Sequence, residues 1–252
     1  MIGLWSRLIS DIKIINRYRI TFKNWMNVLY SIKIKKPDVI EFEFRNGKKI
    51  KLKCFEKGVR NGEFSAFLGD YKFLEPIKDN TVIDIGANIG DSALWFAIMG
   101  ANKVIAFEPY KYSYNFAIKN TQLNDLNETI ILVNAGYGKD GFIELEDTVT
   151  NEGTVLKEYK GGLRTPIMSL KTILEKYSHI LKGELLLKMD CEGCEYNIFE
   201  ENKETLMQFK RVLIEYHNGY EGLKKYLEEC GFRCSFTGPH KQGYLYAKNG
   251  RK

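Results

Sequence analysis

The sequence lacks any apolar stretch long enough to cross a membrane. Its longest uncharged, mostly apolar run covers about ten residues around 93–101, whereas a transmembrane helix needs roughly 20. A short basic start followed by an apolar stretch and a small-residue cleavage site is also absent, so no secretory signal is expected. We therefore expect a cytoplasmic protein without a transmembrane span, which can still lie at the periphery of a membrane.

Cysteine is scarce, and its odd count of five argues against a disulfide framework of the secreted kind. Cys191 and Cys194 form a C-x-x-C pair, which could bind zinc together with Cys230 and Cys234, or act as a redox pair. The pair directly follows an apolar strand and lies among acidic residues, not on an exposed knuckle. We therefore expect packed thiols at these positions, and no metal site in the protein.

Acidic residues are few in the first quarter of the chain. Residues 1–60 contain 15 Lys and Arg against 5 Asp and Glu, a net charge of +10, whereas the remaining residues carry a net charge of −4. An anionic membrane surface or another polyanion is a candidate partner for residues 1–60. The alternative is a charged face that contacts only solvent.

Residues 1–78 are predicted to form an N-terminal extension. Apolar residues at steps of three or four predict a helix over residues 2–32, with a break near Thr21. Two alternating stretches flank Asn46-Gly47 and predict a β-hairpin of residues 39–44 and 49–54. A further helix is expected around residues 63–75, ended by Pro76. We expect the first helix to turn its basic side outward and to bury an apolar stripe made of Trp5, Leu8, Ile12, Ile15, Tyr18, Phe22, Trp25, Leu29 and Ile32.

From residue 79 to residue 252, strands and helices alternate. This order predicts an α/β fold with a mostly parallel, doubly wound sheet and an antiparallel C-terminal edge. Strands are expected at residues 81–85, 103–108, 130–133, 142–146, 184–189, 211–215, 232–236 and 244–247. Helices are expected at residues 92–99, 112–123, 169–177, 195–209 and 220–230. Ligands of such a sheet bind beyond the carboxyl ends of its strands.

A glycine turn at residues 84–90 (D-I-G-A-N-I-G) follows the first of these strands. Gly86 and Gly90 allow a ligand to approach the backbone. Glu108 ends the second strand, 22 residues after Gly86, where a carboxylate can accept hydrogen bonds from ribose hydroxyls. A dinucleotide site would need a glycine in place of Asn88, and Asp84 disfavours a pyrophosphate. The charges of a sulfonium and an ammonium suit Asp84, so these residues favour S-adenosylmethionine over NAD.

Three segments together resemble the FkbM-type S-adenosylmethionine-dependent methyltransferases: residues 84–90 (D-I-G-A-N-I-G), 106–109 (A-F-E-P) and 188–195 (K-M-D-C-E-G-C-E). The resemblance covers roughly residues 80–235, and residues 1–78 match no motif that we can name. It implies a class I (Rossmann-like) methyltransferase fold, with Asp84, Gly86, Asn88, Gly90 and Glu108 at the cofactor. Because many members of the family methylate hydroxyls of sugars or natural products, it also implies O-methylation.

Three residues near the ends of the second and third strands are candidates for the adenine region. Asn134 and Ala135 follow the third strand, where the adenine should lie in this fold. Tyr110 follows Glu108 and could pack on the adenine, or could pack only at the surface.

Three further residues are candidates for catalysis. Asp190 ends the fourth strand and faces the methyl-transfer position of this fold, and Glu192 follows it. His217 ends the fifth strand on the same face as Glu215, because strand side chains alternate with period two. A carboxylate or an imidazole there could remove the proton of an acceptor hydroxyl. The alternatives are acids that enrich a helix N-terminus, as for Glu195, and a histidine with a structural role.

The sequence thus favours an O-methyltransferase whose acceptor is a sugar, a glycolipid, another lipid-linked molecule or a small molecule. A methyltransferase acting on RNA is an alternative, because residues 1–60 are basic. A non-catalytic binding protein on the same fold is a third hypothesis.

Overall fold

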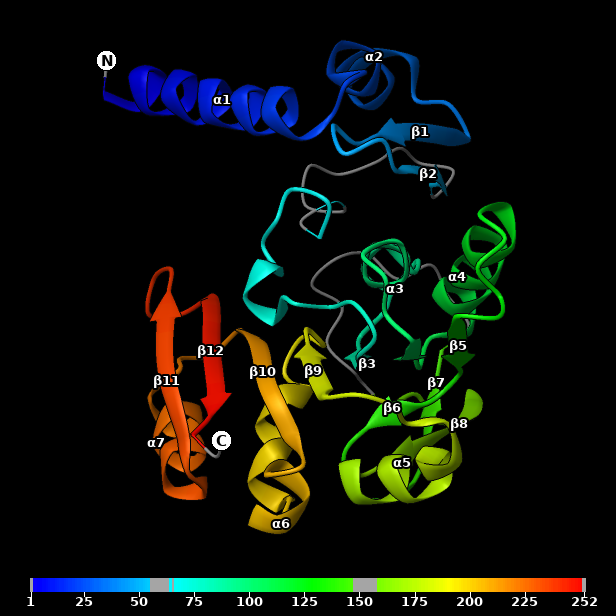
Figure 1. Ribbon diagram of the computed structural model, residues 1–252, viewed down its shortest axis with the longest axis vertical. Helices are drawn as coiled ribbons and strands as arrows, with labels where there is room; N and C mark the ends of the chain where they lie inside the picture. Colours follow the sequence, from blue (N-terminus) through cyan, green and yellow to red (C-terminus); the bar gives the residue numbers. More distant parts are fainter. Residues whose placement is uncertain (1, 55–63, 65, 147–157, 251–252) are drawn as a thin grey trace.

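The computed structural model describes residues 2–54, 64, 66–146 and 158–250, with side chains from residue 12 onward. Its centre is a seven-stranded sheet of order β11-β12-β10-β9-β3-β4-β5 (Figure 1). Strands β3, β4, β5, β9 and β10 are parallel, and β12 runs antiparallel between β10 and β11. This confirms the predicted α/β fold of the class I methyltransferase type. The seven strands are β3 (Thr81–Ile85), β4 (Lys103–Phe107), β5 (Ile130–Val133), β9 (Leu185–Met189), β10 (Phe209–Tyr216), β11 (Phe232–Thr237) and β12 (Gly243–Asn249).

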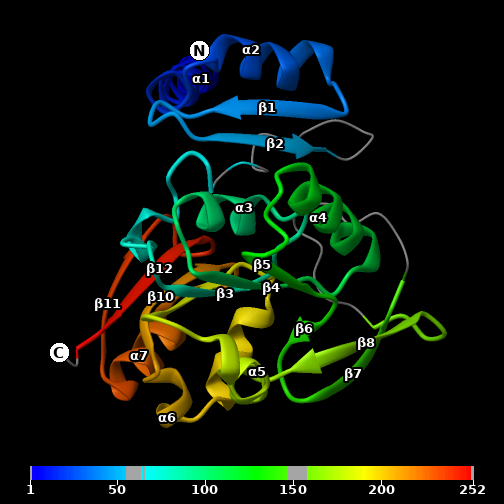
Figure 2. The same ribbon diagram turned by 45° about the vertical axis from the view of Figure 1, so that its right-hand side comes forward.

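Helices cover both faces of this sheet (Figure 2). Helices α3 (Asp91–Ile98) and α4 (Lys111–Leu123) lie on one face, and α5 (Leu170–Tyr177), α6 (Lys203–Leu206) and α7 (Glu221–Cys230) lie on the other. Neighbouring strand residues therefore enter different hydrophobic clusters: Val82 packs with α3, whereas Ile83 packs with α5 and α7. Because both faces are covered, all five residues of β3 are buried.

The N-terminal segment forms a layer over α3 and α4 (Figure 2). It consists of α1 (Ile2–Thr21), α2 (Trp25–Tyr30), a π-helical turn (Ser31–Lys35) and the predicted hairpin of β1 (Val39–Glu43) and β2 (Lys49–Lys53). Asn120 of α4 and Asn124, the residue that caps its C-terminus, bind the free edge of β2. The Lys53 backbone N–H donates to Asn120 Oδ1 at 2.6 Å, and that of Lys51 donates to Asn124 Oδ1 at 2.8 Å. The layer also shares one hydrophobic cluster with the sheet.

The predicted apolar stripe of the first helix is only partly buried. Tyr18 and Phe22 are buried, but Ile12 and Ile15 are 57% and 43% exposed. The prediction that the whole stripe packs on the protein was therefore wrong, because α1 extends past the body of the molecule (Figure 1). Trp5 and Leu8 lie outside the described side chains. Within the described ranges, no helix is both long and apolar enough to cross a bilayer.

Two predicted helices are wrong. In the described part of residues 63–75, the chain forms turns and one short 3₁₀ helix, Lys72–Leu74, because Gly69 takes a left-handed conformation with φ +92°. In place of the helix 195–209, a 3₁₀ helix (Cys194–Glu200) is followed by α6. The Asn202 side chain accepts from the Thr205 N–H at 2.8 Å and starts α6 anew.

A second, three-stranded sheet follows β5. It consists of β6 (Gly136–Tyr137), β7 (Gly141–Leu145) and β8 (Leu163–Met168), in the order β6-β8-β7. Only β7 was expected from the sequence. Strand β6 has two residues and β8 contains a proline, so neither carries a clear strand pattern. A short 3₁₀ turn (Ser178–Ile180) then leads from α5 towards β9.

Candidate functional site

The glycine turn after β3 packs directly against the segment that follows β9. Gly86 has φ +78°, and a Cβ on it would lie 1.8 Å from the carbonyl oxygen of Asp190. Gly90 has φ +87° and is the N-cap of α3, and Asn88 also takes a positive φ of +46°. The predicted cofactor turn and the predicted catalytic segment therefore form one continuous edge of the sheet.

A buried ion pair between β9 and β3 supports this edge of the sheet. Lys188 Nζ lies 2.9 Å from Asp84 Oδ1, and both side chains are almost completely buried. Lys188 also donates to the Gly86 carbonyl at 2.7 Å, and Ser92 Oγ donates to Asp84 at 2.6 Å. Asp84, which was predicted to contact the cofactor, thus supports the glycine turn through Lys188 and Ser92.

Glu108 closes β4 and is held by backbone groups. Its two carboxylate oxygens accept the N–H groups of Asn88 and Tyr110, each at 2.9 Å. Burial raises the pKa of Glu108 to about 7, although both N–H groups and the Lys188 charge oppose this shift. Each carboxylate oxygen keeps a second lone pair, so Glu108 can still accept a hydrogen bond from a ligand hydroxyl.

A small apolar pocket lies at the same strand ends. Its lining residues include Gly86, Phe107, Pro109, Ala135 and Tyr137. This set fits the flat apolar part of a nucleoside, and it includes the predicted residues Gly86 and Ala135.

The other two candidates for the adenine region lie beside the pocket. Asn134 Nδ2 donates to the carbonyls of Glu108 and Pro109, both at 2.9 Å, and so fixes the loop after β4. The Tyr110 side chain is buried, but Pro109 lines the pocket in its place.

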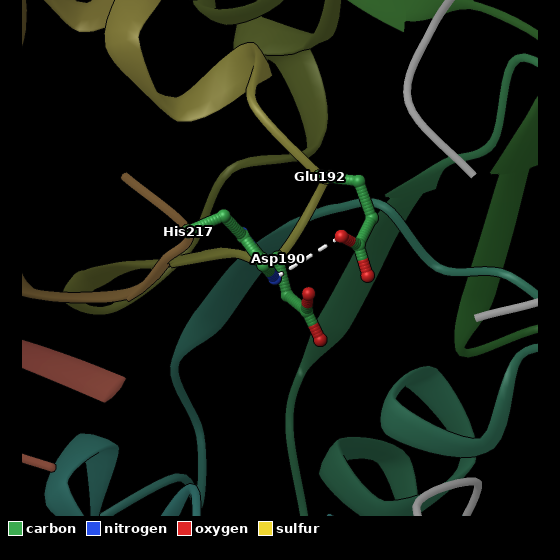
Figure 3. Close-up of side chains that lie close together, drawn as sticks. All are labelled: Asp190, Glu192 and His217. Carbon is green, nitrogen blue, oxygen red and sulfur yellow. Dashed lines mark ion pairs between the residues drawn. The ribbon is translucent and has the colours of Figure 1, made fainter. Parts of the chain in front are cut away.

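The three predicted catalytic residues lie together beyond β9 and β10 (Figure 3). One nitrogen or oxygen atom from each of Asp190, Glu192 and His217 lies within 4.8 Å of the other two. His217 Nε2 is 3.3 Å from Glu192 Oε2 (Figure 3). We call these three residues the strand-end cluster.

A third acid, Glu195, orients the histidine. Glu195 is completely buried, and its Oε1 lies 3.0 Å from His217 Nδ1 and accepts the His217 backbone N–H at 3.2 Å. Burial alone would lower the pKa of the His217 ring, but the hydrogen bond and charge of Glu195, with the charges of Glu192 and Asp190, raise it to about 9. At neutral pH the ring is therefore a proton donor.

The segment that carries Glu192 is cross-linked. Cys191 and Cys194 form a disulfide with their Cα atoms 5.4 Å apart, so the expectation of packed thiols was wrong. The turn between them brings the two sulfurs together, because Glu192 and Gly193 both take positive φ values, +54° and +112°. A left-handed conformation is unfavourable for a glutamate and is typical of functional segments.

The sequence did not identify three residues of the site as functional candidates: Tyr71, Lys188 and Glu215. Tyr71, from the turns that precede the 3₁₀ helix Lys72–Leu74, is buried and donates to Asp190 Oδ2 at 3.3 Å, and Lys188 Nζ lies over its ring. Burial and the charge of Asp190 raise the pKa of Glu215 to about 8. Lys188 belongs to the K-M-D motif and Glu215 shares the face of His217, but no sequence signal marked Tyr71.

The fold resembles those of solved structures whose sequences have low identity to this chain. The chain is 17% identical to M. jannaschii TYW2, solved in complex with AdoMet, with a TM-score of 0.46 and coverage of 84% of this chain and 85% of that one. It is 13% identical to M. capricolum TrmK, solved in complex with S-adenosyl-homocysteine, with a TM-score of 0.44 and coverage of 72% and 67%.

Comparisons of the sequence identify a family. The chain is 28% identical over 147 residues to the uncharacterized protein 158B of Sulfolobus islandicus rod-shaped virus 1, a match that covers 58% of this chain and 65% of the relative. It thus spans less than two thirds of that relative's length. The model of the methyltransferase FkbM domain matches residues 84–234, which contain the glycine turn, Glu108 and the strand-end cluster. The chain therefore belongs to the FkbM methyltransferase domain family, whose methyl donor is S-adenosylmethionine.

Proposed function

We propose that the protein is an S-adenosylmethionine-dependent methyltransferase that methylates a hydroxyl group of a sugar, a glycolipid or a related small-molecule acceptor. The observation that carries this proposal is the direct packing of the Gly86 turn against Asp190. It joins a small apolar pocket to a cluster of side chains that can accept and donate protons.

The residues around the glycine turn fit the methyl donor. S-adenosylmethionine supplies a methyl group on a positively charged sulfur, and methyl transfer to an oxygen leaves S-adenosylhomocysteine. Glu108 would accept hydrogen bonds from the ribose hydroxyls, because its position at the end of β4 matches this role in nucleotide-binding sheets. The backbones of Gly86, Asn88 and Gly90 and the pocket wall at Ala135 would position the nucleoside.

Asp190 is the group that we assign to the acceptor. As a new O–C bond forms and the S–C bond breaks, the acceptor hydroxyl must lose its proton, and the Asp190 carboxylate would accept it. Burial and the charge of Asp190 raise the pKa of the neighbouring Glu215 to about 8, so Glu215 holds a proton at neutral pH. Tyr71 donates to the same carboxylate and would hold it in position.

His217 has a different role in this proposal from the one expected from sequence. A ring with a pKa of about 9 is protonated at neutral pH and is a poor general base. It would instead hold Glu192 and Asp190 in place.

The test of this function is turnover. Purified protein incubated with S-adenosylmethionine should release S-adenosylhomocysteine when a lipid or glycan fraction is added, and one component should gain the mass of a single CH₂ group. Methylation of RNA alone would overturn the acceptor class, and no turnover with lipid, glycan or RNA fractions would favour a non-catalytic role.

The same proposal includes an anionic membrane surface as the partner of the N-terminal layer. Met26, Tyr30 and Ile34 are 65%, 55% and 69% exposed and are spaced four residues apart, which places them on one helical face. Lys33 and Lys35 are exposed beside them. An apolar face bordered by lysines is typical of helices that lie in the interface of an anionic bilayer. The layer also lies at one end of the long axis of the molecule (Figure 1).

Vesicle co-sedimentation tests this partner. The protein should sediment with vesicles of phosphatidylglycerol and phosphatidylcholine at low salt, and less at high salt. Both Tyr30→Ser/Ile34→Ser and Lys33→Glu/Lys35→Glu should reduce binding, whereas Phe142→Ser, which changes an exposed aromatic residue elsewhere, should not. Salt-sensitive binding to an RNA homopolymer without binding to vesicles would contradict the membrane assignment.

A further inference from the structure

We infer that Asp190, Glu192 and His217 form a binding site for one divalent transition-metal ion, which would hold two oxygens of a polyhydroxylated acceptor. The metal site stands on the geometry of the strand-end cluster alone. The role of the ion towards the acceptor rests on the proposed methyltransferase function.

The three donors are suitable in kind and in spacing. One imidazole nitrogen and two carboxylate oxygens are ligands for ions such as Mn²⁺, Fe²⁺ and Zn²⁺. Two atoms bound to one ion at about 2.1 Å are at most about 4.2 Å apart. The observed limit of 4.8 Å therefore requires only a small contraction of the cluster.

His217 is oriented as a metal-binding histidine would be. Its Nδ1 is held by the completely buried carboxylate of Glu195 at 3.0 Å, which leaves Nε2 to face the cluster. Nε2 is itself buried and pairs with Glu192 at 3.3 Å, so a bound ion would displace the Nε2 proton and lie between these two groups. A carboxylate that fixes one ring nitrogen while the other binds a metal is the usual arrangement around metal-bound histidines.

The second His–Glu pair of the protein lacks this arrangement. His240 Nε2 lies 3.0 Å from Glu221, but the two side chains are 72% and 56% exposed. Among the described residues, three possible ligands come together in the strand-end cluster, whereas His240 and Glu221 belong to no such group of three. His240 and Glu221 therefore offer a matched control.

The charges around the cluster favour a bound cation. Asp190, Glu192 and Glu195 lie within six residues of one another, and Glu215 is close enough for the charge of Asp190 to raise its pKa. The nearby cation Lys188 pairs with Asp84 below the turn. A divalent ion would place its positive charge among these acids, where the Gly86 turn ends.

Three protein ligands leave coordination positions open for the acceptor. Neighbouring hydroxyls of a sugar could occupy two of them, and the ion would lower the pKa of the hydroxyl to be methylated. The Asp190 oxygen that does not bind the ion would then take up the released proton. This assignment narrows the acceptor class from hydroxyl compounds in general to polyhydroxylated ones.

Electron paramagnetic resonance with Mn²⁺ tests the site on the full-length protein after EDTA treatment and dialysis. Addition of protein should reduce the six-line signal of free Mn²⁺ to the extent expected for one ion per chain. Glu192→Gln should weaken binding at least about 10-fold, whereas Glu221→Gln should leave it unchanged. The pulsed spectrum of bound Mn²⁺ should show a nitrogen coupling that is lost in His217→Gln.

Thermal melting and S-adenosylmethionine binding identify variants that keep their fold. Glu192→Gln is the primary variant, because its side chain is 27% exposed and keeps its size. Absence of Mn²⁺ binding by the wild-type protein, or equal binding by folded Glu192→Gln, would overturn the metal site. Methylation that continues in EDTA would contradict the role of the ion while leaving the methyltransferase assignment intact. Mn²⁺ binding without any turnover would contradict the methyltransferase assignment while leaving the metal site intact.

Discussion

The two halves of the site hold their carboxylates in different ways. At the end of β4, Glu108 is buried and both of its oxygens accept backbone N–H groups. At the ends of β9 and β10, the strand-end cluster is only half-buried, and its side chains contact one another. Glu108 is thus a hydrogen-bond acceptor that backbone groups hold in place. The strand-end cluster is a group of titratable side chains that hold one another.

Because of this difference, one half suits the binding of the methyl donor and the other suits proton transfer or cation binding at the acceptor. A carboxylate held by the backbone stays in place when a ligand binds, so it suits the recognition of ribose hydroxyls. A cluster of interacting titratable groups can exchange protons or bind a cation at small cost, so it suits the acceptor. Lys188 connects the halves, because it pairs with Asp84 and also donates to Gly86.

The largest effect is expected where the halves are joined. Lys188→Met should lower the free energy of unfolding by about 3–5 kcal/mol, because it leaves the buried Asp84 carboxylate without its cation. Urea unfolding would measure this loss. Adding Asp84→Asn to Lys188→Met should restore part of it, and Lys225→Met, in an exposed pair, should change nothing. Equal stability of Lys188→Met and wild type would mean that the pair does not hold the edge.

The next prediction distinguishes the two halves by their effects on turnover and on donor affinity. Asp190→Asn should lower turnover about 100-fold or more, because the acceptor loses the carboxylate that takes its proton. The affinity for S-adenosylmethionine should change much less, because Glu108 and the glycine turn remain. Steady-state kinetics and calorimetry together would measure this contrast. Near wild-type turnover in Asp190→Asn would remove the basis for assigning catalysis to the strand-end cluster.

The reciprocal variant should show the opposite pattern. Glu108→Ala should weaken S-adenosylmethionine binding by roughly 1.5–3 kcal/mol, because it removes the acceptor for the ribose hydroxyls. Titration calorimetry measures the loss, and Glu108→Gln, which keeps a carbonyl acceptor, should lose less. If Glu108→Ala binds the donor as tightly as wild type, the ribose assignment at β4 is incorrect.

The last prediction concerns pH, with which stability should change gradually. Burial raises the pKa of Glu108 from its ordinary 4.5 to about 7, so the folded protein binds more protons than the unfolded chain between these values. The stability that Glu108 contributes is therefore full below pH 4.5 and is lost as the pH rises towards 7, at no more than about 1.4 kcal/mol per pH unit. Denaturation across this range should show the wild type losing stability relative to Glu108→Gln. A difference that stays constant or grows with pH would contradict the assigned shift.

The sequence predicted the strand-end residues well because parallel strands carry their carboxyl ends to one edge. Asp190 and His217 are separated by 27 positions in the sequence, yet β9 and β10 are paired neighbours, and the two residues lie in one cluster. It failed at the helix 195–209, where the apolar spacing did not reveal that Asn202 starts a separate helix. It also placed Asp84 at the cofactor, although tertiary contacts commit this carboxylate to Lys188 and Ser92.

By itself, the sequence determined the α/β class, the order of most strands and helices, the glycine turn and the positions of Glu108 and Asp190. These features follow from local patterns: buried strands, turn residues and acids at strand ends. Only the tertiary structure decided that Tyr71 reaches Asp190, that Glu195 orients His217 and that Cys191 bonds to Cys194. The first two contacts join residues 119 and 22 positions apart. Because their side chains meet only when separate elements pack together, no local pattern in the sequence could indicate them.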